Sequence, residues 1–240
     1  MKMQSLLDHY KMLWFFQFHR FEGDNYRKMR DYFAEVLIRE FEEFVDIKGR
    51  RVLDVGGANG EFCKILQDKR GCDAVNLDPF PENIIWPATV KAWADAMPLP
   101  DCDFDALVCR GVIEHIDYEK QLPSLKEMFR VAKPGACCYM MTQPWWNPHA
   151  GHHLKPFHIF PFPIAKKLRK LIGQTVPIKG NSYADERLFG RSFSGWEKLF
   201  LASGFHVEKR LDTHFKLHFL TRIPLIREIL VPSVVWILKK

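Results

Sequence analysis

Three aspartates follow or close short apolar segments, at the points where buried strands would end. Asp54 lies near the end of residues 52–55, Asp78 closes a second such segment, and Asp95 follows a third. In open α/β sheets, ligands bind beyond the carboxyl ends of the strands. A carboxylate at the place of Asp78 can accept two hydrogen bonds from a ribose diol, and Asp95 or its neighbouring backbone could contact an adenine amino group. The spacing therefore predicts a nucleoside-binding site.

A glycine-rich turn follows the first of these segments. Gly56, Gly57 and Gly60 let the backbone turn tightly and let a ligand approach it. The helix expected after them offers free N–H groups at its start. The turn matches neither G-x-G-x-x-G nor G-x-x-x-x-G-K-[ST], so we do not expect the pyrophosphate cradles of those motifs. A purely structural strand–helix corner would use the same glycines.

Histidines supply the candidate bases, because an imidazole with its unperturbed pKa of about 6.5 can take a proton at neutral pH. One follows Glu114, and four gather in a later segment: His115, His149, His152, His153 and His158. We select His115, His152 and His153 as catalytic candidates, with a hydrogen-bonded helix start as the alternative for His115. No metal is expected, because the adjacent His152 and His153 would point apart in a strand and no acidic residue lies nearby in the sequence.

The segments around these residues alternate between strand and helix. Apolar runs predict strands over residues 51–55, 73–77, 90–93, 104–109, 136–142 and 205–211. Helical spacing predicts helices over residues 5–20, 24–46, 59–69, 122–131 and 193–201. Such alternation is typical of βαβ units. It predicts a Rossmann-like α/β fold, with about seven mostly parallel strands and helices on both faces.

We expect one domain over residues 1–240, built from four parts. N-terminal helices over residues 1–47, the second capped by Asp24, precede a nucleoside-binding core over 48–142. Residues 143–190 are rich in Pro, His, Trp and Lys and are predicted to form an inserted cap, and residues 191–240 complete the sheet. Aromatic residues in the first helix could form a lid over the cofactor or part of the acceptor pocket: Trp14, Phe15 and Phe18.

The order of these pieces resembles the class I S-adenosylmethionine-dependent methyltransferases. The matching segments are VLDVGGANG, NLDP, ADAMPLPDCDFD, CRGVIEHI and RVAKPGACCYMMT, within residues 48–142, with a weaker match at 192–212. The resemblance implies S-adenosylmethionine as cofactor and S-adenosylhomocysteine as product. The cofactor-binding residues that it implies are Asp54, Gly56, Gly57, Ala58, Gly60, Asp78, Pro79, Asp95, Ala96, Arg110 and Gly111. The family often has a second glycine where this chain has Ala58.

Residues 150–158 also resemble a segment of methyltransferases from glycan-assembly clusters. This implies O-methylation of a small-molecule or glycan acceptor, including a lipid-linked glycan. Aromatic residues of the predicted cap could stack on a sugar or simply form the cap's core: Trp145, Trp146, Phe157, Phe160 and Phe162. Two alternatives stay open, a methyltransferase for a lipophilic ring such as a quinone precursor and a cofactor-binding partner subunit without catalysis.

The net charge differs in sign between two parts of the chain. Residues 1–150 carry 19 Lys/Arg and 23 Asp/Glu, a net charge of −4, whereas residues 151–240 carry 16 and 6, a net charge of +10. A basic region suits phosphate, an anionic lipid surface or nucleic acid. Nucleic acid is disfavoured, because no RNA-binding module is recognisable. Strand 104–109 also ends in Cys-Arg-Gly-Val. It lacks the Asn/Asp-Pro-Pro-Tyr turn, and a chain with that turn would resemble the methyltransferases that act on the amino groups of nucleic-acid bases. We expect peripheral membrane contact through the basic, apolar C-terminal part.

The six cysteines contain no C-x-x-C pair and are expected to be reduced core thiols of a cytoplasmic protein. No signal peptide is predicted. The apolar stretch at residues 223–238 is shorter than the roughly 20 residues that a membrane span needs. The sequence therefore predicts a cytoplasmic location, with the membrane contact at the surface only.

Overall fold

The computed structural model describes residues 3–19, 22–173, 178–212 and 214–240. The chain divides into two compact units, Met1–Asp46 and Ile47–Lys240. Residue 20, in the first predicted helix, and residues 174–177, in the predicted cap, lie outside the described residues.

The first unit consists of α1 (Met3–His19) and α2 (Asn25–Glu42). The two helices are linked by a 3.4 Å hydrogen bond between Tyr32 Oη and His9 Nδ1. Asp24 precedes α2 as predicted, but its carboxylate pairs with Arg27 at 3.0 Å and makes no capping hydrogen bond among the described residues. The proposed lid function of this unit stays a prediction.

The second unit is built on a seven-stranded sheet in the order β3–β2–β1–β4–β5–β7–β6. Its strands are β1 (Arg51–Val55), β2 (Asp73–Leu77), β3 (Thr89–Val90), β4 (Phe104–Arg110), β5 (Ala132–Thr142), β6 (His206–Asp212) and β7 (Val234–Lys239). Strands β1 to β5 are parallel, and β7 is antiparallel to both of its neighbours, β5 and β6. The predicted, mostly parallel α/β sheet is confirmed.

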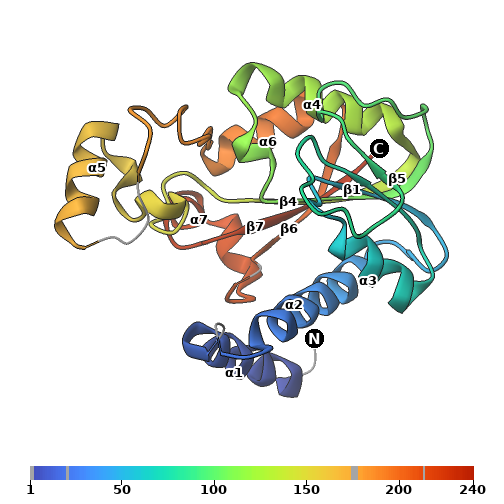
Figure 1. The fold of residues 1–240 in the computed structure, drawn as a ribbon, viewed down its shortest axis with the longest axis horizontal. Helices are drawn as coiled ribbons and strands as arrows, with labels where there is room; N and C mark the ends of the chain where they lie inside the picture. Colours follow the sequence, from blue (N-terminus) through green and yellow to red (C-terminus); the bar gives the residue numbers. More distant parts are fainter. Residues whose placement is uncertain (1–2, 20–21, 174–177, 213) are drawn as a thin grey trace. The chain divides into compact units, whose positions relative to one another are not determined.

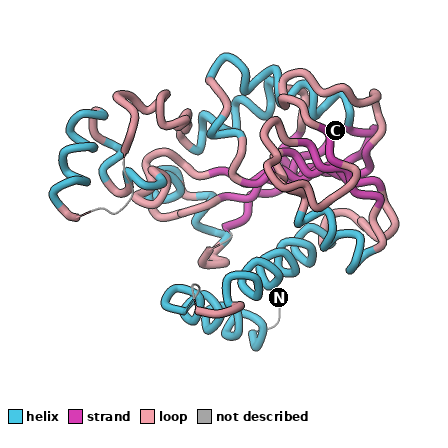
Figure 2. Tube along the Cα trace, in the orientation of Figure 1, coloured by secondary structure: helices cyan, strands magenta, loops and turns pink. Residues whose placement is uncertain are grey.

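Helices cover both faces of this sheet (Figures 1 and 2). On one face lies α3 (Glu61–Arg70), and on the other lie α4 (Tyr118–Val131) and α6 (Phe193–Ala202). The central strands are apolar on both faces because both are covered. Fully buried side chains include Leu53, Leu107, Trp196, Phe200 and Trp236.

Two predicted boundaries differ from the structure around β3 and β5. The strand predicted at residues 90–93 is only Thr89–Val90, because the chain turns away after pairing with the end of β2. The strand predicted at residues 136–142 begins earlier, at Ala132, and the register of β5 with β4 shifts between Phe104 and Ala106. Pro134 has no N–H to give to a regular ladder, so the irregularity falls at this point.

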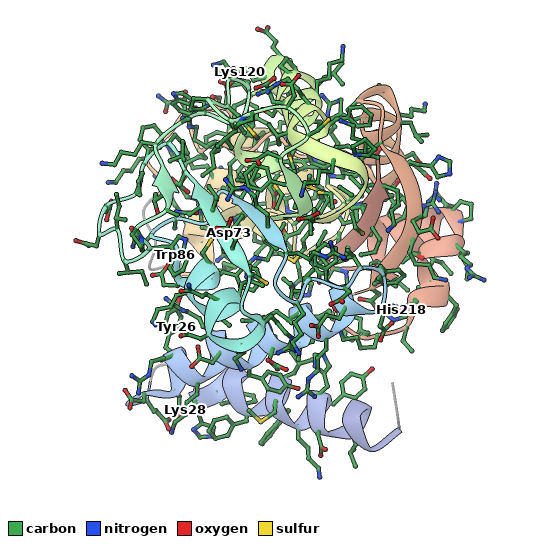
Figure 3. The ribbon with its side chains drawn as sticks, turned by 90° about the vertical axis from the view of Figure 1, so that its right-hand side faces the viewer. Tyr26, Lys28, Asp73, Trp86, Lys120 and His218 are labelled. Atoms are coloured by element: carbon green, nitrogen blue, oxygen red, sulfur yellow. The ribbon has the colours of Figure 1, made fainter. Side chains whose placement is uncertain are left out.

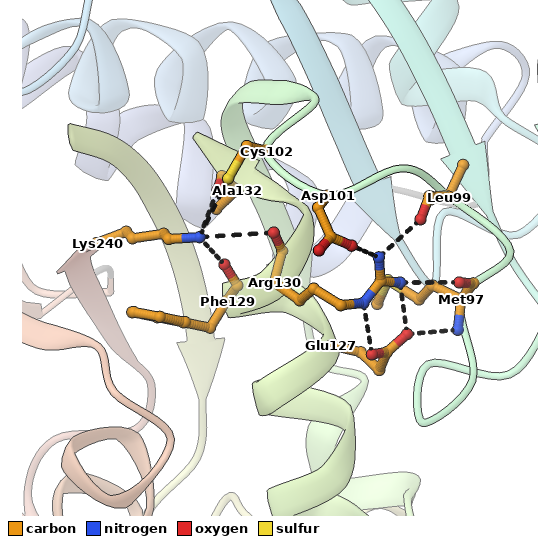
Figure 4. A network of polar contacts seen from close by, with 9 residues as sticks. All are labelled: Met97, Leu99, Asp101, Cys102, Glu127, Phe129, Arg130, Ala132 and Lys240. Atoms are coloured by element: carbon orange, nitrogen blue, oxygen red, sulfur yellow. Dashed lines mark hydrogen bonds and ion pairs between the residues drawn. The ribbon is translucent and has the colours of Figure 1, made fainter. Parts of the chain in front are cut away.

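The end of the chain corrects a further prediction. The apolar stretch at residues 223–238 follows η4 (His218–Arg222) and forms α7 (Pro224–Ile229) and most of β7, whose residues 234–238 are buried inside the sheet. Residues 234–238 are therefore not available to a membrane. Lys240, expected to contact lipid, donates from Nζ to the carbonyl oxygens of Phe129 and Ala132 at 2.8 Å each (Figure 4).

The predicted cap, residues 143–190, has a small apolar core of its own. Its elements are η2 (His152–Leu154), η3 (Phe157–Ile159) and α5 (Phe162–Leu171). Trp145, Phe157 and Phe162 pack in this core with Leu154, so they are unavailable for stacking on a sugar. Trp146 and Phe160 are exposed. Of the two alternatives for the aromatic residues, the structure supports core packing for these three.

Within the described residues, no helix combines the length and the hydropathy that a membrane span requires. All six cysteines are free thiols, and five of them are buried. The sixth, Cys102, is exposed, so the prediction of a core thiol is wrong there.

Candidate functional site

A cavity of about 260 Å³ lies at the carboxyl ends of β1, β2 and β4. Five residues predicted from the sequence are among those that line it: Gly56, Asp78, Pro79, Gly111 and His115. Residues that sequence analysis did not single out complete the lining: Val55, Leu77, Phe80, Trp93, Ala94, Val112, Ile116 and Arg187. The walls are mostly apolar, and the few polar groups are those that can fix a ligand's orientation.

The glycine turn between β1 and α3 forms one wall because larger residues would not fit. Gly56 has φ +75°, and a Cβ there would lie 2.3 Å from Val112 Cγ2. A Cβ on Gly57 would lie 2.3 Å from the carboxylate oxygen Oδ2 of Asp54. Gly60 begins α3 in the left-handed region, with φ +87°. The turn therefore brings bare backbone against the buried carboxylate and the cavity.

Asp78 closes the opposite side of this turn. Its Oδ2 accepts a hydrogen bond from Ala58 N at 2.9 Å, and its Oδ1 accepts one from Phe80 N at 2.8 Å. Ala58 stands at φ +50°, a region that alanine rarely adopts, and the bond to Asp78 holds it there. Each carboxylate oxygen has a second lone pair, so Asp78 can still accept hydrogen bonds from a ligand in the cavity.

Asp54 lies behind the turn and is fully buried. Burial raises the pKa of this carboxyl group, and Arg110, whose guanidinium lies 3.8 Å from Oδ2, opposes the shift. Oδ2 has no hydrogen-bond partner among the described residues. The guanidinium of Arg110 also stacks on the ring of Phe62 at 4.0 Å. A charged carboxylate in this place is suited to a cationic group of a ligand.

The predicted adenine contacts, Asp95 and Ala96, lie beside the cavity and not in its lining. Asp95 pairs with Lys120 Nζ at 3.2 Å, and Lys120, labelled in Figure 3, also lies over the ring of Trp93. Ala94 takes the place in the lining that we expected for Ala96.

A single arginine fixes the loop that carries these residues (Figure 4). Arg130 of α4 donates to the carbonyl oxygens of Met97 and Leu99 at 3.0 and 2.8 Å. It also pairs with Asp101 at 2.5 Å and with both carboxylate oxygens of Glu127. The planar, charged guanidinium of Arg130 therefore holds the loop between β3 and β4 against α4.

Beside the cavity, two histidines and a glutamate converge. Gly111 and His115 line the cavity, and Glu114 Oε1 lies 3.7 Å from where a Cβ on Gly111 would be. The rings of His115 and His152 are 4.7 Å apart. Burial raises the pKa of Glu114 to about 7, and burial together with His115 lowers the pKa of His152 to about 4.

The third catalytic candidate, His153, lies elsewhere. Its Nε2 is 2.8 Å from Glu186 Oε2, and it does not join the cluster formed by the other two histidines. The expectation that no acid lies near these histidines is wrong, because Glu186 and Glu114 reach them from distant parts of the sequence. His158 donates from Nε2 to the carbonyl oxygen of Trp145 at 2.7 Å and is a buried structural residue.

Residues 187–191, at the end of the predicted cap, are held beside this site by hydrogen bonds to the buried side chain of Gln121. Gln121 Nε2 donates to the carbonyl oxygens of Ile113, Ile116 and Phe189 at 2.9–3.1 Å. Its Oε1 accepts from Arg191 Nε at 2.6 Å. Arg187, which lines the cavity, therefore reaches it on a segment that is tied to η1 (Ile113–His115) and α4.

Sequence reasoning missed two kinds of lining residue. Phe80 and Trp93, in edge-to-face contact at 5.0 Å, follow the ends of β2 and β3, where any residue is well placed to line a cavity. That position was the available signal. Arg187 comes from 72 residues beyond His115, and its backbone oxygen bonds to that ring. No sequence pattern joins these two residues.

Comparisons with known proteins identify the family of this chain. The family described as "Methyltransferase domain" matches residues 26–209. The chain belongs to this family. The predictions of a class I S-adenosylmethionine-dependent methyltransferase, of its fold and of its cofactor are confirmed.

Relatives and solved structures show how far the likeness extends. An uncharacterized methyltransferase of Mycobacterium bovis is 30% identical over 204 residues, which cover 79% of this chain and 76% of the relative. Another, of Mycobacteroides abscessus, is 32% identical over 130 residues, and there the match spans about half of each protein, 49%. Neither name specifies an acceptor.

Among solved structures, a Haloferax volcanii methyltransferase in complex with the Trm112 methyltransferase activator matches with a TM-score of 0.58 and 15% identity, covering 89% of this chain and 92% of that one. The [4+2]-cyclase SpnF also matches with a TM-score of 0.58, at 12% identity, covering 89% and 81%. These likenesses concern the fold alone. Because one of these folds carries a cyclase, the reaction must be argued from the site.

Proposed function

We propose that this methyltransferase transfers a methyl group from S-adenosylmethionine to an oxygen atom of a small-molecule or glycan acceptor. The observation that carries the proposal is one cavity that holds both a nucleoside-type carboxylate, Asp78, and an imidazole, His115. Asp78 suits a ribose diol, and His115 suits a hydroxyl group that must lose its proton. Both would serve the same ligand pair, because both groups line one cavity.

The residues of the glycine turn and its surroundings fit the cofactor. The buried Asp54, whose Oδ2 accepts no hydrogen bond among the described residues, supports a place for the cationic methionine end. Gly56 and Gly111 provide bare backbone, and the apolar side chains of Phe80 and Val112 provide walls for a flat base. When bound, S-adenosylmethionine supplies an electrophilic methyl group on a positively charged sulfur.

The chain's own task is then to exclude water, align the acceptor and manage a proton. The carbonyl oxygen of Arg187 lies 2.7 Å from His115 Nδ1. A carbonyl can only accept, so Nδ1 carries the hydrogen and the second ring nitrogen of neutral His115 presents a lone pair. That nitrogen can take part in removing the proton of an acceptor hydroxyl, with Glu114 and His152 beside it.

A lipid-linked acceptor is supported by the surface of α5. Its exposed apolar residues Ile164 and Leu171 lie on the same helix as the exposed Lys167 and Lys170. Apolar side chains mixed with basic ones suit a peripheral contact with anionic headgroups. We therefore assign the proposed membrane contact to α5 and not to β7.

The experiment is a methyl-transfer assay with the purified chain, labelled S-adenosylmethionine and a panel of hydroxylated acceptors, sugars and lipid-linked sugars included. We expect S-adenosylhomocysteine to bind and one hydroxyl acceptor class to be methylated, with His115→Ala reducing transfer at least about 100-fold, the size of a general acid–base contribution. A matched variant, His149→Ala, removes an exposed imidazole of the predicted cap and should not change transfer.

Each alternative corresponds to a different result. Methylation of a carbon or of a quinone-type ring, with sugars untouched, would favour the lipophilic-ring hypothesis. Tight binding of S-adenosylhomocysteine without turnover on any acceptor would favour a non-catalytic partner subunit. Failure to bind S-adenosylhomocysteine at all would overturn the proposal.

A further inference from the structure

We propose that Glu114, His115 and His152 form a binding site for a divalent transition-metal ion beside the cofactor cavity. One carboxylate oxygen and one ring nitrogen from each histidine all lie within 4.8 Å of one another. Two histidines with one carboxylate are a donor set of catalytic zinc and non-haem iron sites. The inference rests on the proposed function, since it concerns the acceptor side of the same site.

The carboxylate is the first independent observation. Glu114 is only 5% exposed, and its Oε2 has no hydrogen-bond partner among the described residues. Its backbone is fixed, because the carbonyl oxygen of Glu114 accepts a bond from Phe189 N at 2.8 Å. A buried carboxylate oxygen that accepts no hydrogen bond is costly, and a bound cation would offset that cost.

The orientation of the His115 ring is the second independent observation. Histidines that bind a metal usually donate their other ring N–H to a carbonyl or carboxylate, which fixes the tautomer and turns the ring. Here the carbonyl oxygen of Arg187 lies 2.7 Å from Nδ1 of His115. The ring is therefore already in the form that presents its second nitrogen as a ligand.

The placement of the His152 ring is the third independent observation. Its buried Nε2 has no hydrogen-bond partner among the described residues, and its ring centroid lies 4.7 Å from that of His115. The backbone of His152 has φ +48°, which is rare for a residue with a side chain and holds the ring at the start of η2. Two imidazoles this close would repel each other if both were protonated, whereas both can bind one cation when neutral.

The donor set indicates the class of ion. Two nitrogens and one oxygen suit Zn²⁺ or a neighbouring transition ion better than Mg²⁺ or Ca²⁺, which prefer oxygen ligands. Bonds of about 2.0–2.2 Å require the three ligand atoms to move slightly closer, which side-chain rotation can provide. Three protein ligands leave a position open, and a hydroxyl bound there would lose its proton more easily.

Metal binding to the whole chain tests the site directly. The protein is stripped with a chelator, and Zn²⁺ is titrated by calorimetry while Co²⁺ is followed by its visible absorption. We expect one ion per chain and a Co²⁺ spectrum typical of nitrogen and oxygen ligands. His152→Gln and Glu114→Gln should each weaken Zn²⁺ binding at least about 10-fold, in line with losses seen on disturbing metal sites.

The control and the second readout keep the two proposals separate. His149→Ala, in the same predicted cap but exposed, should bind Zn²⁺ as the unmodified chain does. Circular dichroism confirms that each variant is folded, and S-adenosylhomocysteine affinity is measured on the same samples. If S-adenosylhomocysteine binds and neither metal does, the metal site is overturned while the methyltransferase proposal stands. If metal binds with equal affinity to all variants, these three residues are not its ligands.

Discussion

At the scale of single residues, the carboxylate of Asp78 is the group that links the turn to the cavity. It holds the backbone N–H groups of Ala58 and Phe80 and lines the space proposed for the cofactor. Asp78→Asn keeps the size of the side chain but removes the charge and one accepting oxygen. We expect the dissociation constant of S-adenosylhomocysteine to rise about 10- to 100-fold, the effect of losing about 1.5–3 kcal/mol in hydrogen bonds to a charged group.

Calorimetry with S-adenosylhomocysteine measures this change. The matched control is Asp68→Asn, an exposed aspartate on α3 that pairs with Lys64 at 3.0 Å. Unchanged affinity in Asp78→Asn, with the control also unchanged, would remove Asp78 from the ribose site.

The buried carboxylate of Asp54 should favour cofactor binding but lower the stability of the fold. Burial raises the pKa of Asp54, so the folded state carries a penalty when this carboxyl is ionised. Asp54→Asn removes the charge, and we expect it to stabilise the fold by about 1 kcal/mol at neutral pH while weakening cofactor binding. The penalty begins to fall as the pH drops through the raised folded-state pKa and is gone below the unfolded value near 3.8.

Denaturant unfolding of both proteins as a function of pH checks the sign. The advantage of Asp54→Asn should be largest at neutral pH and should shrink on acidification. An advantage that grows as the pH falls would contradict this account of the site.

At the scale of elements, Gln121 joins η1, α4 and the segment that returns from the predicted cap. Gln121→Leu would leave the carbonyl oxygen of Phe189 and the guanidinium of Arg191 without this hydrogen-bond partner. We expect a loss of about 2–3 kcal/mol in stability, since each unsatisfied buried group costs about 1–3 kcal/mol. Faster amide exchange should appear first at residues 187–191, which this side chain holds.

Thermal melting and hydrogen exchange with mass spectrometry test this role. Gln67→Leu, on the exposed face of α3, is the control and should change neither quantity much. Equal exchange rates at residues 187–191 in Gln121→Leu and the unmodified chain would show that the segment is held by other contacts.

The elements also show what a sequence can predict. The alternation of apolar runs with helical spacing was enough for β1, β2, β4 and their helices, because each boundary is set by local chemistry such as the glycines at residues 56–60. The placement of β7 was not predictable this way. Its apolar residues suit a buried strand and a surface segment equally, and only pairing with β5 and β6 decides between them.

The candidate site divides in the same manner. Asp78 and Gly56 could be predicted because they stand at the ends of local strands. The meeting of Glu114 with His152, or of His115 with Arg187, depends on how a long irregular segment folds back, and no spacing in the sequence encodes it.

At the scale of the whole molecule, the excess of 10 positive charges in residues 151–240 is the feature to test. If α5 contacts anionic lipid, the chain should co-sediment with phosphatidylserine-containing vesicles at low salt and be released at high salt. The double variant Lys167→Glu and Lys170→Glu should lower vesicle binding at least about 10-fold, since each basic residue near the surface contributes about 1 kcal/mol.

A second double variant controls for net charge alone. Lys126→Glu and Lys198→Glu reverse two exposed lysines on α4 and α6 and should affect vesicle binding less. Equal losses in the two variants would point to a nonspecific charge effect. Salt-sensitive retention by RNA in place of vesicles would assign the positive charge to nucleic acid.

The position of β7 between β5 and β6 also constrains the order in which this protein can be assembled on the ribosome. Strand β6 is synthesised before β7, yet within the described residues it pairs with β7 alone. Until residues 234–239 have left the exit tunnel, β6 has no strand to pair with and β5 presents an open edge to solvent. The nascent chain can form the half of the sheet around β1 early. The other half can form only after β7 has been synthesised. Chaperone protection of β5 would be needed most during that interval.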